Sequence, residues 1–386
     1  MQIAKILPII VLCCFATGKA ELASAVTFSD QDVSDVGGTS AEYVIHDSSE
    51  DDGWFTVGPD CDGCGNCEQC RVGWFNKVIR PACPRWTAQI DALMLWQNNI
   101  PSRPLFGSPP FTPPVVGPTV LDADQLQTPM TAGPRLGLQL HLDNCFAIEG
   151  NWLLVDGFNG FQTLGPGEYD HLDIAGLNFA NVTSATVSSG GQLQSAELNW
   201  RRRADLVTWL AGFRWVQWNA RLDITNQFSQ TAPTTLAGTD TVNVLTGNDL
   251  YGGQVGADLR VWEVGRWLKL SSIGKAGIFY NPAYQRIVRT SVFTTGGTDE
   301  TVPGDGQADQ TSFFGEIGLN ANVNLRSWLS WHIGYSLFWL SGVATPAEQL
   351  SEVDLVGTLG PINQVGINTN GSVFLHGVTT GIEARW

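Results

Sequence analysis

The feature that most constrains the fold is a period-two alternation of apolar and polar residues, repeated along the chain in blocks of about ten residues. In the stretch WTAQIDALMLW, every second residue from Trp86 to Trp96 is apolar, and Thr87, Gln89 and Asp91 lie between them. Alternation of this kind predicts a β-strand with one apolar face. Ten residues at about 3.3 Å each, tilted by about 40°, cover about 25 Å, which is the height of the lipid-facing band of an outer-membrane β-barrel.

The same pattern returns further along the chain. Clear alternation occurs at 134–143, 206–218, 250–262, 312–324 and 328–340. Less regular segments lie at 147–158, 193–203, 267–281 and 373–386. Together these segments predict an all-β fold, namely a transmembrane antiparallel β-barrel of about ten strands (about 10–12).

The predicted connections alternate between short and long. Short turns are expected near 143–147, 202–205, 264–266 and 326–327, and long loops over 99–133, 159–192, 229–248, 295–309 and 342–371. Outer-membrane barrels have short periplasmic turns and long outer loops, whereas the strands of soluble β-sandwiches alternate without this division of loop lengths. No later stretch approaches 18 uninterrupted apolar residues, which argues against helical membrane spans.

The first 25 residues predict a secretory signal peptide that is cleaved on export. Lys5 precedes an apolar run from Ile6 to Ala16, and small residues that suit cleavage follow, at Ala20 or Ala25. The mature chain is therefore expected in the cell outer membrane if the barrel prediction holds.

The next segment has a different composition from the rest. Residues 21–70 carry 12 of the 37 acidic residues and no Lys or Arg. We expect residues 26–84 to form a flexible, acidic, cysteine-rich periplasmic segment, and residues 85–386 to form the barrel. The net charge of −16 argues against nucleic acid as a partner.

Six cysteines remain after the signal peptide, and an even number in an oxidising compartment favours disulfides. A Cys83–Cys145 bridge fits the topology, because both residues fall on the periplasmic side. Four others recur every third residue and would pair among themselves or with a partner: Cys61, Cys64, Cys67 and Cys70. A zinc site and an iron–sulfur cluster are the alternatives, but four ligands within ten residues strain a tetrahedron, and the spacing departs from that of ferredoxins. We expect no metal and no cofactor.

Polar and charged residues on the inward faces are expected to line the lumen and to pair there. They are Asp91, Arg214, Asp258, Arg260, Lys275, Glu316, His332, Glu383 and Arg385. His332 and Glu316 lie on neighbouring predicted strands, so a contact between them would be a lumen hydrogen bond or, less favoured, a catalytic dyad. Four acidic side chains are expected at the outer mouth: Asp299, Glu300, Asp305 and Asp309.

Aromatic residues mark the predicted membrane border. Tryptophans gather beside the short turns, as an interfacial girdle would: Trp200, Trp262, Trp267, Trp328 and Trp386. The C-terminal stretch TTGIEARW resembles the signal that the barrel-assembly machinery reads, with Gly381 and Trp386 in two of its places.

Several stretches resemble a known family. AQIDALMLW, AELNWRRR, LAGFRWVQW, NDLYGGQVGADLRVW and GVTTGIEARW are similar to the planctomycete-type "putative β-barrel porin" family. The resemblance covers about 85–386 and implies an outer-membrane barrel with passive transport. It carries no catalytic motif.

These observations lead to two main hypotheses on function. The first is a porin through which small solutes diffuse passively, with an acidic outer mouth that favours cations. The alternative is a structural or adhesive barrel without an open pore, whose acidic loops bind polysaccharide or protein through divalent cations. A barrel-embedded hydrolase is a weaker third reading, and we expect no enzyme activity, because the chain lacks HExxH, GxSxG and Walker motifs.

The expected partners follow from the same reading. They are outer-membrane lipid, the barrel-assembly machinery, and small solutes or ions, with divalent cations at the outer loops. A barrel of about ten strands is narrow, and side chains can fill much of its interior. The sequence therefore leaves open how far the lumen is blocked.

Overall fold

The computed structural model describes residues 84–98, 100–108, 118–126, 128–142, 145–167, 170–171, 182–204, 206–230, 235–265, 267–350 and 366–386. The predicted signal peptide lies outside these ranges, and so do the predicted segment 26–84, apart from Pro84, and the first five mature cysteines. Within the described residues, no helix is long and apolar enough to cross a membrane.

Ten strands form one closed antiparallel ring, which confirms the predicted barrel and its strand number. The strands are β1 (Trp86–Asn98), β4 (Thr131–His141), β5 (Phe146–Asp156), β8 (Val182–Ala204), β9 (Val207–Gln230), β10 (Leu236–Val264), β11 (Leu268–Thr295), β12 (Glu300–Arg326), β13 (Leu329–Val343) and β14 (Gly371–Arg385). The ring closes because β1 pairs with both β4 and β14, so that Asp91 lies opposite Arg135 on one side and Gly381 on the other.

The predicted alternation is present in the ring. Outward side chains such as Ile90, Phe213 and Ile278 are exposed, whereas inward ones such as Asp91 and Arg214 are buried. The girdle tryptophans Trp200, Trp262, Trp267, Trp328 and Trp386 are all exposed near the short turns. A second aromatic row lies about ten residues along the strands, where Tyr251 is opposite both Trp215 and Tyr280. The two rows mark the borders of a lipid-facing band.

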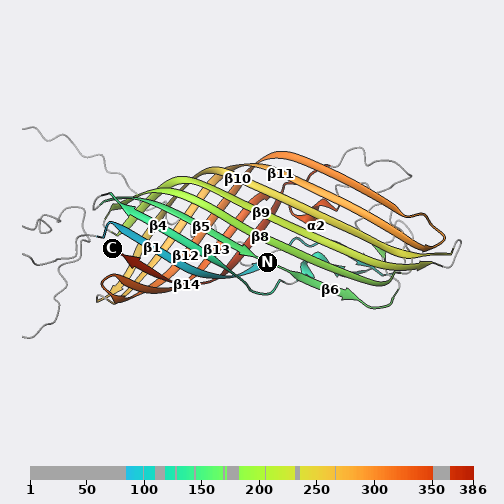
Figure 1. Cartoon of the computed structure of the whole chain (residues 1–386), viewed down its shortest axis with the longest axis horizontal. Coiled ribbons are helices and arrows are strands. Elements are labelled where there is room, and N and C mark those ends of the chain that lie inside the picture. Colours follow the sequence, from blue (N-terminus) through green and yellow to red (C-terminus); the bar gives the residue numbers. More distant parts are fainter. Residues whose placement is uncertain are drawn as a thin grey trace, which may run out of the picture. The chain divides into compact units, whose positions relative to one another are not determined.

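Strand length differs around the ring. β10, β11 and β12 have 29, 28 and 27 residues, whereas β1 has 13 and β4 and β5 have 11 each. Figure 1 shows β9, β10 and β11 running well past the region that β1, β13 and β14 occupy. One wall of the barrel therefore projects beyond the lipid-facing band.

This projection corrects three predicted loops. The spans 229–248 and 295–309 are mostly strand, and the connections there are confined to 231–235 and 296–299. In the span 159–192, residues 182–192 belong to β8. The alternation of apolar and polar residues is lost there, because a strand that extends beyond the lipid needs no apolar residues on its outward face. On β12 the outward positions change from Ile317 and Leu319 to Asp305 and Asp309, although the ladder with β11 continues.

The long connections that remain between the strands carry small elements. Those after β1 and β5 contain β2 (Pro104–Gly107), β3 (Thr119–Asp122), η3 (Ala123–Gln125), β6 (Gly160–Leu164) and β7 (Asp170–His171), and the one after β13 contains α2 (Pro346–Gln349). β2 pairs with β3 and β7 in a separate three-stranded sheet, and β6 extends the main sheet beside β8. The described short turns lie where the sequence predicts them.

Candidate functional site: the barrel lumen

A network of buried charges fills the half of the lumen that lies nearest the short turns. Arg214 Nη1 donates to Glu316 Oε2 at 2.8 Å and lies 3.5 Å from Glu197 Oε2. Lys275 Nζ donates to Glu197 Oε1 at 2.5 Å. These four side chains are at most 5% exposed. Two cations thus share two carboxylates in a site with little access to solvent.

The network continues toward the neighbouring strands. Arg135 pairs with Glu316, and Arg201 bridges Glu149 and Asp258, the latter at 2.9 Å. Amide side chains occupy the remaining hydrogen-bonding positions: Gln254 Nε2 donates to Glu197 at 2.6 Å, and Asn151 Nδ2 donates to Glu149 at 2.7 Å and to Glu197 at 2.8 Å. Hydrogen bonds between several strands hold this network in one arrangement, although Arg201 Nε has no partner among the described residues.

His332 belongs to a separate pair in the same half. Its Nε2 lies 2.8 Å from Asp91 Oδ1, and Gln89 Nε2 donates to Asp91 Oδ2 at 2.7 Å. The contact between His332 and Glu316 that the sequence allows does not form, because His332 is opposite Asn322 while Glu316 is opposite Phe338, six residues along β12. The sequence placed both residues inward but could not give their register.

An apolar layer lies directly above the charges. Leu93, Leu95, Leu153, Val155, Phe158, Leu193, Val216, Trp218, Leu250, Phe279, Phe314, Phe338, Leu340, Val343, Val373 and Leu375 form one buried cluster. The guanidinium of Arg214 stacks 4.2 Å from the ring centroid of Phe314, and that of Arg135 lies 5.6 Å from Phe338. These cation–π contacts join the charged half of the lumen to the apolar half.

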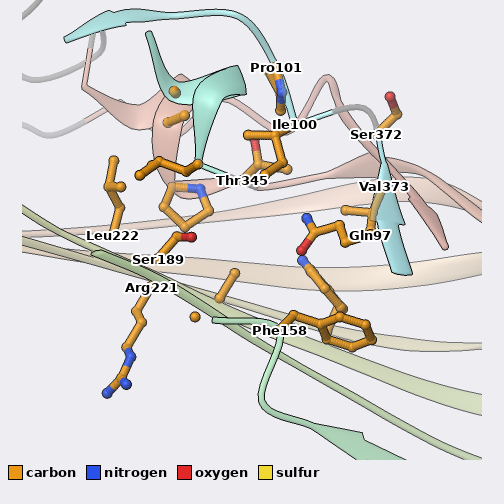
Figure 2. A pocket seen from close by; sticks show the side chains of 17 residues that line it. Gln97, Ile100, Pro101, Phe158, Ser189, Arg221, Leu222, Thr345, Ser372 and Val373 are labelled. Atoms are coloured by element: carbon orange, nitrogen blue, oxygen red, sulfur yellow. The ribbon is translucent and has the colours of Figure 1, made fainter. Parts of the chain in front are cut away.

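Connections that fold inward continue the apolar filling at the outer end. Leu105, Phe106, Leu121 and Leu126, from the connection after β1, and Ala347 and Leu350, after β13, pack against inward residues of the tall wall such as Leu222 and Val244. A cavity of about 50 Å³ remains where the two apolar clusters meet. In Figure 2, Thr345 and Ile100 lie on one side of this cavity and Phe158 lies on the other.

The predicted lumen residues fall into two groups. Asp91, Arg214, Lys275, Glu316 and His332 lie deep in the charged half, and Asp258 reaches it through Arg201. The others lie nearer the short-turn ends of their strands, where Arg260 lies 3.9 Å from Glu263 and Arg385 lies 2.6 Å from Glu383.

Sequence reasoning missed several members of the network: Arg135, Glu149, Glu197, Arg201 and Gln254. Three of them, Glu149, Glu197 and Arg201, lie in segments that alternate less clearly. The signal was nevertheless present, because in SAELNW the inward Ser195, Glu197 and Asn199 alternate with an outward face that ends at Trp200. Reading backward from the girdle tryptophan would have found Glu197.

The acidic residues predicted at the outer mouth are spread over the β11–β12 hairpin. Asp299 lies in the turn, where its carboxylate accepts from the Phe293 backbone N–H at 2.8 Å, and Glu300 begins β12. Asp305 and Asp309 lie on the outward face of β12, where Asp305 is 3.8 Å from Arg286 and Asp309 accepts from the Tyr280 hydroxyl at 2.7 Å. Only the first two are at the tip of the hairpin.

The first and last strands of the ring meet at the end with the short turns. The backbone N–H of Trp386 donates to Trp86 O at 3.0 Å, and Trp86 N–H donates to Trp386 O at 2.9 Å. Gly381 faces Asp91, and a Cβ at position 381 would lie 2.1 Å from Asp91 Oδ1. Cys145 is disulfide-bonded, and its predicted partner Cys83 lies outside the described residues, so that pairing stays a prediction.

The charges of the network near the short turns nearly cancel. Its paired groups comprise five carboxylates (Asp91, Glu149, Glu197, Asp258 and Glu316) and four cations (Arg135, Arg201, Arg214 and Lys275), beside His332. Toward the other end, Asp240 pairs with Arg289 at 3.0 Å and adds one charge of each sign. Within the part of the chain that the structure describes, no group of three or more His, Cys, Asp or Glu side chains is placed to hold a metal ion. Such paired charges can fill the lumen, or can bind water that enters it.

Several solved structures are similar to this chain. The outer-membrane protease OmpT of Escherichia coli covers 78% of this chain and 96% of its own at 9% identity, with a TM-score of 0.38. The Pseudomonas putida toluene transporter TodX covers 79% and 90% at 10% identity (TM-score 0.29), and a Pseudomonas aeruginosa FadL homologue covers 78% and 89% at 10% identity (TM-score 0.25). At these TM-scores the similarities carry no functional inference. No curated protein matches the chain.

The family comparison is more specific. Residues 88–386, which span the whole ring apart from the first two residues of β1, match the model of the family described as Putative beta barrel porin-7 (BBP7). A closed ring with a lipid-facing band bordered by two aromatic rows is the form in which a β-sheet crosses an outer membrane. The chain is therefore a β-barrel of the cell outer membrane and belongs to the Putative beta barrel porin-7 family.

Proposed function

We propose that this barrel allows slow, passive diffusion of small solutes and rests in a closed state. One observation supports this most directly: the lumen is filled in series by a charged half and an apolar half. A layer of inward apolar side chains excludes water and ions until it is displaced, as hydrophobic constrictions do in channels. The passage would therefore open only intermittently.

The charged half supports passage over a purely structural role. Replacing a buried ion network by apolar side chains of similar volume is often neutral or stabilising, so such a network contributes little that packing could not supply. A structural barrel could fill its whole interior as the outer half is filled here, with leucine and phenylalanine. Charged side chains bind water readily, so they suit a lumen that water and solutes must enter from one end.

The finer points of the prediction belong to the same proposal. Because the lumen charges nearly cancel, a preference for cations would arise at the outer end, near Asp299 and Glu300, and divalent cations would gather there. We further propose that the barrel-assembly machinery reads the C-terminal strand with Gly381 and Trp386, and that the protein is no enzyme. Pairing of His332 with Asp91 inside the lumen supports a structural role for this histidine.

A second candidate function is a structural or adhesive surface barrel that never conducts. The same filling of the lumen favours it, because among the described residues the interior is closed by both wall side chains and inward connections. The two candidates differ in whether weakening the apolar layer produces a current.

Planar-bilayer recordings test the proposal. We expect wild-type protein to give rare, small current steps, and the double variant Phe314→Ala with Phe338→Ala to open frequently. Phe313→Ala is the matched control, because Phe313 neighbours Phe314 in sequence but faces outward, where its ring makes an edge-to-face contact with Trp339. A double variant that folds, as shown by different gel migration before and after boiling, yet carries no current would contradict passage and leave the second candidate.

Ion selectivity in the double variant tests the cation preference separately. Neutralising Asp299 and Glu300 to Asn and Gln should reduce the preference for potassium over chloride. An unchanged preference would refute that part of the proposal while leaving passive diffusion intact.

A further inference from the structure

Two inward connections close the outer end of the lumen, and they are held in different ways. The connection after β1 contributes large buried side chains, among them Phe106 and Leu126, and its β2 strand pairs with β3 and β7. The segment after β13, residues 344–350, contributes Ala344, Ala347 and Leu350. We call it the inward segment. Of these three anchors only Leu350 is large, so polar contacts must hold much of the segment in place.

The main polar contact is a two-point hydrogen bond between a wall side chain and the inward segment. Asn248 of β10 is fully buried, its Oδ1 accepts from the Ala344 N–H at 2.7 Å, and its Nδ2 donates to Ala344 O at 2.9 Å. The amide thus pairs with both backbone groups of Ala344 as a neighbouring strand would. Asn281 of β11 donates to Asn248 Oδ1 at 3.2 Å and to Gly342 O at 3.3 Å.

Gly342 is where the chain turns inward. Its φ of 77° lies in the region that favours glycine, and the register between β13 and β14 shifts there, between Ser341 and Val343. The wall is also irregular at this level, because the pairing of β10 with β11 is interrupted between Gly247 and Tyr251. Asn248 lies in this stretch, where its backbone pairs with β9 alone and its buried side chain contacts the inward segment.

The underside of the inward segment is incompletely packed. Thr345, Pro346 and Ala347 line the cavity of about 50 Å³, and Trp218 and Val373 of the apolar layer line it from below. Figure 2 shows Thr345 and Val373 at this cavity. Lifting the segment would expose the outer surface of the apolar layer to water without first breaking close contacts across the cavity.

From these contacts we propose that the inward segment is the movable part of the closure and that Asn248 is its latch. This inference rests on the proposed function, since it names what regulates the same lumen. The segment pivots at Gly342 when the bonds to Asn248 break, and the apolar layer then becomes wet from the outer side. The connection after β1 stays in place, because its phenylalanine and leucine side chains remain buried.

Hydrogen exchange measured by mass spectrometry tests the latch on the full-length protein in lipid vesicles. Asn248→Ala should raise the exchange rate of amides in 344–350 about tenfold or more, because the net contribution of two hydrogen bonds is lost. Peptides that contain Leu121 and Leu126 should not change. Asn243→Ala is the matched control: it lies on the same strand but faces outward and donates to Asp223 at 2.8 Å.

A second variant, Asn281→Ala, removes the amide that supports Asn248 and should raise exchange in the same peptides. Unchanged exchange of 344–350 in both variants would overturn the latch, whatever the conductance.

Conductance tests whether the inward segment controls passage. Adding Asn248→Ala to the double variant Phe314→Ala/Phe338→Ala should raise the opening frequency about tenfold. If Asn248→Ala raises the exchange of 344–350 but leaves the opening frequency of the conducting double variant unaltered, the inward segment does not act as a gate. Raised exchange with no current in any variant would instead reject the proposed passage and leave the latch standing.

Discussion

The two ion pairs on β12 allow a quantitative test of how dry the lumen is. The Glu316 side chain is 2% exposed and accepts from Arg135 and Arg214, whereas Asp305, 71% exposed, lies 3.8 Å from Arg286 on the outside of the same strand. Glu316→Gln and Asp305→Asn each remove one negative charge with little change in shape. Their effects on stability should differ because only one pair is shielded from water.

The expected magnitudes follow from burial. Removing one partner of a buried ion pair costs about 3–5 kcal/mol, since it leaves a charge without compensation. Arg214 keeps Glu197 at 3.5 Å after the change, so we expect Glu316→Gln to lose about 3 kcal/mol, at the lower end. An exposed pair contributes about 0–1 kcal/mol, so Asp305→Asn should lose less than about 1 kcal/mol.

Urea unfolding in lipid vesicles, followed by tryptophan fluorescence and by the migration of unboiled samples on gels, gives both free energies. The reasoning fails if the two variants lose the same stability, or if Glu316→Gln loses less than about 1 kcal/mol. Either result would mean that water reaches the network and screens it. The lumen would then be open to solvent at its charged half, and the apolar layer alone would have to close the barrel.

Two further predictions concern a glycine and a cysteine. Gly381→Ala should destabilise the barrel by about 1–3 kcal/mol in the same urea unfolding, because its Cβ would meet Asp91 Oδ1 at 2.1 Å. Gly274→Ala is the control and should be neutral, because no atom lies within 4 Å of the added Cβ. Equal losses of stability in the two variants would contradict the packing argument. Cys145→Ser should leave one additional free thiol, and peptide mapping after alkylation without reductant should find it at Cys83; a label on any other cysteine would refute the predicted bridge.

The sequence predicted the barrel well because a membrane imposes a simple rule on each strand. A residue that contacts lipid must be apolar, and its neighbours then face the lumen. The ten strands, the short turns and the tryptophan border could therefore be predicted from each segment of sequence separately. The rule also explains the wrong loop boundaries: above the lipid, β12 carries Asp305 and Asp309 outward, and the alternation that identified the strand disappears.

The lumen was less predictable, since its contents depend on which inward residues meet. Leu93 and Leu95 break the polar face of β1, but a single strand does not show whether they are local exceptions or part of a layer. Only the ring brings them together with Phe314, Phe338 and Trp218 in one apolar cluster. The same holds for Glu316, whose partners come from strands far apart in sequence.

The sequence by itself thus determined the class of fold, the side of each strand that faces lipid and the border of the membrane, because these depend on local alternation and on tryptophan positions. Tertiary structure alone decided that the interior is filled in two layers, that His332 pairs with Asp91, and that Asn248 holds the inward segment. The physical reason is register: side chains facing the lumen from ten strands meet only when each strand has its fixed offset against its neighbours, and that offset is set by the closed ring.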